Sequence, residues 1–187
     1  MKNIIIIGPS RVGKSTLSSI LCEKYNLNYI SGDSIRNAFI NIYPFLGYTP
    51  KNTIERIEFC KFINWLIKEN NAHLKRDIYY VIDSADISLD NAIQIFDDAI
   101  IIGVGCKDIT IQDMIEKMKK NDTKLEWTYG YSDDDLYSVA KETITNSKEL
   151  YKKCLNSNVF YFDTSIDRYK TYEEILKYIE NEILEKN

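Results

Sequence analysis

The sequence predicts an α/β fold, a three-layer α/β/α sandwich built around a five-stranded parallel sheet. Short apolar runs of strand character alternate with helical patterns along the whole chain, which is the order expected when helices join parallel strands. No repeat or low-complexity linker interrupts this alternation. The 187 residues, 44% of them hydrophobic, are enough to bury one substantial core. We therefore expect one domain over residues 1–187.

Five apolar runs predict the strands. The first, residues 3–7, ends in four consecutive isoleucines, a run typical of a strand that is buried on both faces. The other expected strands are residues 28–31, 79–82, 99–104 and 159–162.

Helical periodicity predicts the segments between the strands. The expected helices are residues 14–25, 33–42, 53–70, 89–96, 110–120 and 135–155, with a last helix after residue 171. Asn52 with Glu55, and Thr171 with Glu174, form capping-box patterns that predict two helix starts. The apolar members of the helix at 53–70 include Ile54, Ile57, Phe62, Trp65 and Leu66.

Composition narrows the class of protein. The formal net charge is -4 and charges of both signs are mixed along the chain, so we expect no nucleic-acid partner. Four widely spaced cysteines without a C-x-x-C pair indicate reduced thiols: Cys22, Cys60, Cys106 and Cys154. No stretch reaches the roughly 18 apolar residues that a membrane span needs. We expect a cytoplasmic protein with no membrane partner.

The strongest motif is a phosphate-binding loop between the first strand and the first helix. Residues 8–15 read Gly-Pro-Ser-Arg-Val-Gly-Lys-Ser and match G-x-x-x-x-G-K-S/T in full. Glycines let backbone N–H groups curl around phosphate oxygens, and the start of the following helix adds its positive dipole end. The residues expected to bind the nucleotide are Gly8, Pro9, Ser10, Arg11, Val12, Gly13, Lys14, Ser15 and Thr16.

Individual roles follow from this loop. Lys14 is expected to bridge the β- and γ-phosphates, and the Ser15 hydroxyl is expected to be a direct ligand of Mg²⁺. Thr16 is expected near the α-phosphate. ATP and Mg²⁺ are therefore the expected cofactors.

With this loop and this layout, the chain resembles the small-molecule P-loop kinases of the nucleoside and nucleotide kinase superfamily, which includes adenylate, guanylate and shikimate kinases. The resemblance covers nearly the whole chain in layout and is specific only in the loop. There Gly8-Pro9-Ser10 and Val12-Gly13-Lys14 are similar to guanylate kinases, and Arg11 replaces a glycine. It implies a P-loop NTPase fold of the nucleoside monophosphate kinase type. The N-K-x-D motif of GTPases and the L-S-G-G-Q motif of transport ATPases do not occur.

The resemblance also implies where the phosphate acceptor binds. Such kinases carry a carboxylate after the second strand that accepts the acceptor's proton or helps hold magnesium, and a nearby arginine that grips the acceptor's anionic group. Asp33 and Arg36 match by position, and a spacing of three puts both on one face of a helix. Asp33 could instead be only the helix N-cap. Lys14, Asp33 and Arg36 are the expected catalytic residues, and residues 33–75 the expected acceptor-binding region.

A second carboxylate follows the third strand. Asp83 ends an apolar run and is the candidate for the acid that holds a magnesium-bound water, so Ser15 and Asp83 form the expected metal site. Asp83 could otherwise be a turn former. Asp86 on the following loop is a weaker candidate.

Residues 107–158 occupy the place of the superfamily's lid, but this stretch contains no arginine. Its lid candidates are Lys117, Lys119, Lys120 and Lys124, which lack the bidentate fork of a guanidinium. Arg11 or Arg76 could take over part of the lid's role, or be solvated.

Other positions carry weaker signals. Trp127, Tyr129 and Tyr131 could be a platform for a ring or could pack in a core or interface. His73 is expected to be exposed. Thr164 and Ser165, after the fifth strand, are expected neighbours of the nucleotide.

The sequence thus predicts an ATP-dependent phosphotransferase that moves the γ-phosphate to a small molecule, such as a nucleoside, a nucleotide, a hydroxyl metabolite, an antibiotic or a cofactor precursor. The alternative is a nucleotide-binding regulator or slow ATPase without an acceptor, which the missing lid arginines favour. The expected partners are a nucleoside triphosphate and a small-molecule acceptor, and a homodimer is left open.

Overall fold

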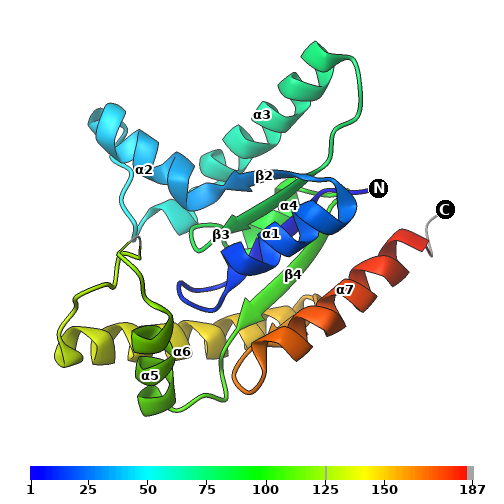
Figure 1. The fold of residues 1–187 in the computed structure, drawn as a ribbon. Helices are drawn as coiled ribbons and strands as arrows, with labels where there is room; N and C mark the ends of the chain where they lie inside the picture. The colour runs from blue at the N-terminus through cyan, green and yellow to red at the C-terminus, as the bar shows by residue number, and fades with distance from the viewer. Residues whose placement is uncertain (125, 185–187) are drawn as a thin grey trace.

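The sheet forms the centre of the molecule (Figure 1). A computed structural model describes residues 1–124 and 126–184, and within these residues five strands pair in parallel in the order β2-β3-β1-β4-β5. The strands are β1 (Ile4–Ile7), β2 (Asn28–Ser31), β3 (Tyr80–Ser84), β4 (Ile100–Gly105) and β5 (Tyr161–Asp163). The predicted fold class is confirmed.

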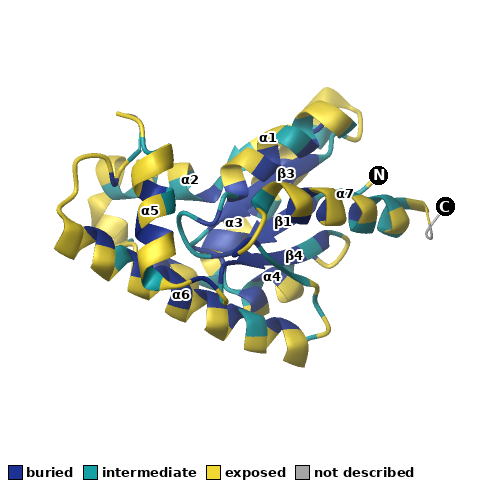
Figure 2. Ribbon diagram, turned by 60° about the horizontal axis from the view of Figure 1, so that its bottom comes forward, coloured by how far each residue is buried: buried dark blue, intermediate teal, exposed yellow. Residues whose placement is uncertain are grey.

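Helices cover both faces of this sheet. They are α1 (Lys14–Tyr25), α2 (Gly32–Ile42), α3 (Ile57–Leu74), α4 (Leu89–Ile95), α5 (Ile111–Asn121), α6 (Asp133–Asn156) and α7 (Arg168–Leu184), with short 3₁₀ turns η1 (Pro44–Leu46) and η2 (Thr53–Glu55). Figure 2 shows buried strands between helices whose outer faces are exposed. In the described part of the chain, no helix is long and apolar enough to cross a membrane.

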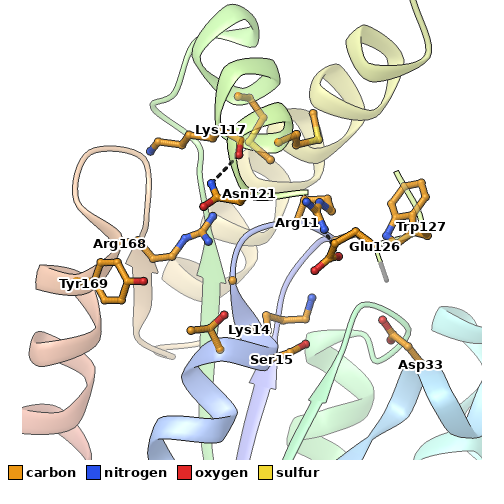
Figure 3. Close-up of a pocket in the computed structure, with 15 residues that line it drawn as sticks. Arg11, Lys14, Ser15, Asp33, Lys117, Asn121, Glu126, Trp127, Arg168 and Tyr169 are labelled. Carbon is orange, nitrogen blue, oxygen red and sulfur yellow. Dashed lines mark hydrogen bonds and ion pairs between the residues drawn. The ribbon is translucent and has the colours of Figure 1, made fainter. Parts of the chain in front are cut away.

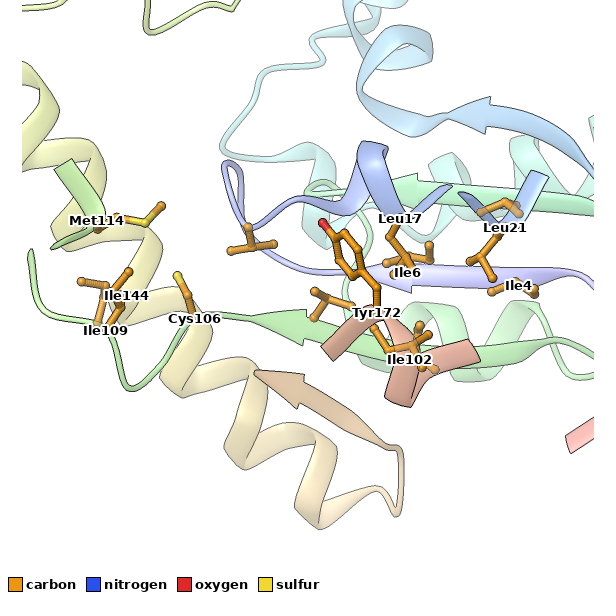
Figure 4. Close-up of a cluster of buried hydrophobic side chains, with 14 of the residues drawn as sticks. Ile4, Ile6, Leu17, Leu21, Ile102, Cys106, Ile109, Met114, Ile144 and Tyr172 are labelled. Atoms are coloured by element: carbon orange, nitrogen blue, oxygen red, sulfur yellow. The ribbon is translucent and has the colours of Figure 1, made fainter. Parts of the chain in front are cut away.

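The isoleucine run of β1 feeds two hydrophobic cores because successive side chains of a strand point to opposite faces. Ile4 and Ile6 pack with residues of α1 and α7, including Leu17 and Tyr172 (Figure 4). Ile5 and Ile7 pack with α3, α4 and the end of α6. This central strand pairs with β3 on one side and β4 on the other, so the loop that follows it starts from a fixed point.

The start of α3 differs from the prediction. Residues 53–55 form η2, and α3 begins at Ile57. Asn52 does not cap it: its side-chain oxygen accepts a hydrogen bond from the Thr49 N–H, closing a local turn instead. The face of α3 that meets the sheet carries Phe59, Cys60, Ile63 and Ile67. The apolar residues Ile54, Phe62, Trp65 and Leu66 stay exposed.

The last helix also starts earlier than predicted. Asp167 accepts hydrogen bonds from the backbone N–H groups of Tyr169 and Lys170, which is the pattern of an N-cap. Thr171 therefore lies inside α7, where its hydroxyl donates to the Asp163 and Asp167 carbonyls. The predicted start of this helix at Thr171 was wrong because Asp167 supplies the cap.

Candidate functional site

The phosphate loop lies at the carboxyl end of β1, between α2 on one side and α5 on the other (Figure 1). Gly13 caps α1 with φ 93°, a left-handed conformation that glycine adopts without strain. Gly8 lies so close to β4 that a Cβ there would be 2.0 Å from the Val104 carbonyl oxygen. Both glycines of the motif are thus required by the path of the backbone.

Lys14 is buried inside the loop. Its Nζ donates to the Pro9 carbonyl at 2.8 Å, so the side chain curls over its own loop (Figure 3). Burial lowers the pKa of Lys14, and the nearby carboxylates of Asp33, Asp83 and Asp86 oppose that shift. The fold therefore brings three aspartates, from the start of α2 and from the end of β3 with its following loop, close to Lys14.

Asp83 is held under the loop from the neighbouring strand. It lies within β3 and is 2% exposed, with its carboxylate accepting from the Tyr29 hydroxyl at 3.0 Å and the Ser18 hydroxyl at 3.1 Å. Burial raises its pKa, and Lys14 and the hydroxyl donors, Ser15 among them, oppose the rise. The turn-former alternative for Asp83 was wrong, because the residue is part of the strand.

Asp33 lies at the start of α2 and faces a cavity in front of the phosphate loop. Ser31 caps that helix by accepting from the Ser34 N–H, so the N-cap alternative for Asp33 was wrong. One Asp33 oxygen accepts from the Ser84 hydroxyl at 3.1 Å and from the Ala85 N–H at 3.0 Å. Burial favours the neutral acid, but Lys14 and the Ala85 N–H outweigh it, so the pKa of Asp33 is lowered.

Arg36 forms an ion pair with Asp86, a contact that the sequence did not indicate. Its Nη1 donates to both Asp86 oxygens, at 2.8 and 2.6 Å, and its other nitrogens donate to Asn37. The Asp86 side chain is 4% exposed and that of Arg36 is 15% exposed. Burial and the charge of Asp33 raise the pKa of Asp86 to about 7, against the opposing effect of Arg36.

The loop and Asp33 open onto one cavity of about 400 Å³ (Figure 3). Its far wall comes from α5, the segment after it and the start of α7, with Lys117, Asn121, Trp127, Arg168 and Tyr169. Arg168 was missed in the sequence because it lies more than 150 residues from the loop and outside the predicted lid. Its only sequence signal is its place shortly after the fifth strand.

The lid-like segment is tied directly to the phosphate loop. Arg11, with φ 67°, pairs with Asp122 and Glu126, and the Thr128 hydroxyl also donates to Asp122. Trp127, Tyr129 and Tyr131 are about half exposed, so the core-packing alternative does not describe them. Trp127 lines the cavity and packs edge-on against Tyr131.

Other candidate residues lie outside the cavity. The Thr164 hydroxyl donates to the Val12 and Gly105 carbonyls, and the Ser165 hydroxyl accepts from the Asp108 N–H, so both brace the loops around the site. His73 is exposed in the last turn of α3, as expected. Arg76 precedes β3 and therefore lies where the parallel strands begin, whereas the phosphate loop lies where they end.

Comparisons with known proteins fit this geometry. No family model matches the chain. It is 27% identical to an adenylate kinase of Mycoplasmopsis pulmonis (strain UAB CTIP) over 216 residues of alignment, covering 98% of this chain and 99% of that protein. A 54-residue stretch, 29% of this chain, is 48% identical to an adenylate kinase of Thermococcus sibiricus but covers only 24% of that protein.

Solved structures share the fold over the full length. A gluconokinase from Sinorhizobium meliloti 1021 matches with a TM-score of 0.58 and 13% identity, over 100% of this chain and 98% of that one. A shikimate kinase from Bacteroides thetaiotaomicron matches with a TM-score of 0.56 and 14% identity, over 96% and 99%. The complete phosphate loop and the full-length likeness to an adenylate kinase support a place for this chain in the superfamily of small-molecule P-loop kinases. The two solved structures show that the fold is shared.

Proposed function

We propose that the protein is an ATP-dependent phosphotransferase that moves the γ-phosphate of ATP to a hydroxyl group of a small molecule. The observation that carries this proposal is that the phosphate loop and the Asp33 carboxylate line the same cavity. A triphosphate held by the loop would point its γ-phosphate into the space that Asp33 faces. Positioning and charge stabilisation then supply most of the catalysis.

The nucleotide half of the site is the loop, residues 8–16. Its backbone N–H groups and the start of α1 would bind the phosphates, and Lys14 would leave the Pro9 carbonyl to bridge the β- and γ-phosphates. The lid region, residues 107–158, contains no arginine. Arg168 and Lys117 line the cavity and would supply the positive charge in its place. Nucleotide binding would bring these groups together.

Magnesium fits the residues beside the loop. Among the described residues, no group of three or more histidine, cysteine, aspartate or glutamate side chains could hold a metal on its own. Magnesium would therefore be bound by one or two protein oxygens together with the phosphates of the nucleotide. The Ser15 hydroxyl and the Asp83 carboxylate are close enough for Ser15 to lower the pKa of Asp83, and hard oxygen donors of this kind suit Mg²⁺. Ser15 would be a direct ligand and Asp83 would hold a bound water. Bound there, Mg²⁺ would neutralise charge on the β- and γ-phosphates.

Asp33 is the proposed proton acceptor within the acceptor-binding region, residues 33–75. Its low pKa keeps it ionised at neutral pH, and its hydrogen bonds to Ser84 and Ala85 fix its orientation. The acceptor oxygen forms a bond to the γ-phosphorus as the bond from that phosphorus to the β-phosphate bridging oxygen breaks. The hydroxyl proton passes to Asp33, and ADP leaves.

The test is Asp33→Asn, which keeps the size of the side chain and one hydrogen-bonding oxygen. We expect turnover to fall by roughly 100-fold to 10,000-fold, with ATP affinity nearly unchanged. Asp97→Asn is the matched control. Asp97 is exposed and precedes β4, so it lies where the strands begin, away from the cavity. Wild-type turnover in Asp33→Asn would remove Asp33 from the mechanism.

The kinase and the regulator alternative differ in one readout. Incubation with γ-labelled ATP and a panel of hydroxyl compounds should move the label to an acceptor. Tight MgATP binding with release of label only as inorganic phosphate would favour the regulator. A cytoplasmic location and a homodimer stay predictions from the sequence.

A further inference from the structure

The Arg36–Asp86 ion pair bears on which acceptors can bind. Arg36 lies one helical turn after Asp33 on α2. The resemblance to small-molecule kinases places there the cation that binds an acceptor's anionic group. In the structure both oxygens of Asp86 already accept from its Nη1, and Asn37 accepts from its Nε and Nη2. Asp86 thus occupies the arginine as a bound carboxylate would.

The other arginine of the acceptor-binding region is also engaged by the chain. Arg56 donates to the Leu46 carbonyl at 2.8 Å and the Gly47 carbonyl at 3.3 Å, and its guanidinium lies 4.4 Å from the centre of the Tyr48 ring. Arg36 and Arg56 are the two arginines in the sequence of residues 33–75. Neither guanidinium is free to bind a phosphate or a carboxylate through two parallel hydrogen bonds.

The charge around the site disfavours an anion further. On the side of the site formed by α2 and β3, Asp33, Asp83 and Asp86 carry three carboxyl groups against the cations of Lys14 and Arg36. Lys14, and with it Lys117 and Arg168 on the far wall of the cavity, is assigned to the triphosphate in the proposed mechanism. An anionic acceptor that captured Arg36 would leave Asp86, 4% exposed, without this partner beside Asp33. A buried carboxylate that loses the cation it is paired with is strongly destabilised.

We propose that the acceptor is a hydroxyl compound without negative charge, either neutral or cationic, and that Asp86 excludes phosphorylated and carboxylated acceptors by occupying Arg36. The proposal rests on the phosphotransferase function and narrows its substrate class. Nucleosides, sugar alcohols and amino alcohols are then expected as acceptors, and nucleotides and sugar acids are not. The bond changes are those given above, with the proton of the hydroxyl passing to Asp33.

A binding experiment tests the ion pair without requiring turnover. The full chain is saturated with Mg²⁺ and a non-hydrolysable ATP analogue, so that the phosphate loop is filled. AMP is then titrated by calorimetry above pH 7, where Asp86, whose pKa is raised to about 7, is ionised. Asp86→Asn frees Arg36 and should bind AMP about 10-fold to 100-fold more tightly than the wild type, the range expected for hydrogen bonds to a charged group. The double variant Arg36→Met/Asp86→Asn should lose that gain.

The control is Asp90→Asn, an exposed aspartate on α4 that pairs only at 3.9 Å with Lys153. It should leave AMP binding at the wild-type level. Circular dichroism confirms that each variant is folded. Wild-type protein that binds AMP as tightly as Asp86→Asn, or a folded Asp86→Asn that gains nothing, overturns the proposal.

A transfer experiment separates this proposal from the proposed function. Label from γ-labelled ATP is followed onto matched acceptors: adenosine against AMP, sorbitol against gluconate, and the cationic amino alcohol kanamycin. Uncharged or cationic members should be preferred at least about 10-fold in kcat/KM, the value of one charged hydrogen bond. Preferred transfer to AMP or gluconate overturns the acceptor class and leaves the phosphotransferase standing. Binding of MgATP with no label on any acceptor counts against both, while the AMP titration still judges the role of Asp86.

Discussion

The contact between Gly13 and Tyr172 gives a quantitative test of how α7 supports the phosphate loop. The Tyr172 hydroxyl donates to the Gly13 carbonyl at 2.7 Å, and Tyr172 is 2% exposed. A Cβ at position 13 would lie 2.3 Å from that hydroxyl and 3.0 Å from Arg168 Cδ. Gly13→Ala therefore adds left-handed strain of about 1–2 kcal/mol and displaces a hydrogen bond that contributes about 1 kcal/mol. We expect a loss of about 2–3 kcal/mol in the free energy of unfolding.

A double-mutant cycle isolates the clash. Tyr172→Phe alone should cost about 1 kcal/mol, since it deletes the hydrogen bond. In the Gly13→Ala background the same change removes the clashing hydroxyl, so it should cost nothing or stabilise. The double variant should then be about 1–2 kcal/mol more stable than additivity predicts, which is within the range of coupling energies for residues in contact.

Urea unfolding followed by circular dichroism is the assay. Gly130→Ala is the control for strain, because Gly130 has φ 80° and a Cβ added there would meet no atom within 4 Å. It should lose only about 1–2 kcal/mol. Additive losses for Gly13→Ala and Tyr172→Phe, within about 0.5 kcal/mol, would refute the idea that the hydroxyl and the glycine compete for one space.

Three further outcomes are expected. MgATP at 100 times its Kd should add about 2.7 kcal/mol of stability and raise Tm by about 5–11 °C for a chain of this size, and Lys14→Met should abolish most of that rise in thermal scans. The folded pKa of Asp86, about 7, lies above the ordinary 3.8, so its contribution to stability is complete below that ordinary value and is lost as pH rises toward 7; urea unfolding of Asp86→Asn should show a flatter pH dependence, and an unchanged slope would contradict the assignment. Arg11→Met leaves Asp122, 8% exposed, without its cation and should cost about 3 kcal/mol; adding Asp122→Asn should recover part of this loss.

The phosphate loop could be predicted from sequence because its determinants are local. Gly8, Gly13, Lys14 and Ser15 lie within one loop whose glycine spacing encodes the backbone path. The strand before it is a run of isoleucines, and the helix after it buries Leu17 and Leu21, so strand, loop and helix each support the same interpretation. The bounds predicted for α1 are those of the structure.

The proposed acceptor side of the site, formed by Asp33, Arg36 and Asp86, could be predicted only in part because its residues meet through the sheet. Asp33 and Arg36 were found from their place after the second strand, but their contacts come from segments about 50 residues away. That Arg36 meets Asp86 depends on β2 pairing with β3, and a single sequence does not state which strands are neighbours. The same holds for α3, where two apolar stripes compete and packing against the sheet selects the one with Phe59 and Ile63.

The β2–β3 register decides which residues meet on the proposed acceptor side of the site. Ser31 is paired with Asp83, and this places Asp33, two residues on, against Ser84 and Ala85. A shift of one residue would turn the side chains of β2 to the opposite face. The register is set by four residue pairs at an edge strand, whereas β1 is paired on both sides. The phosphate loop therefore follows a central strand that is paired on both sides. The acceptor-side charges depend on a short edge pairing, which the Asp33 hydrogen bonds to the end of β3 reinforce.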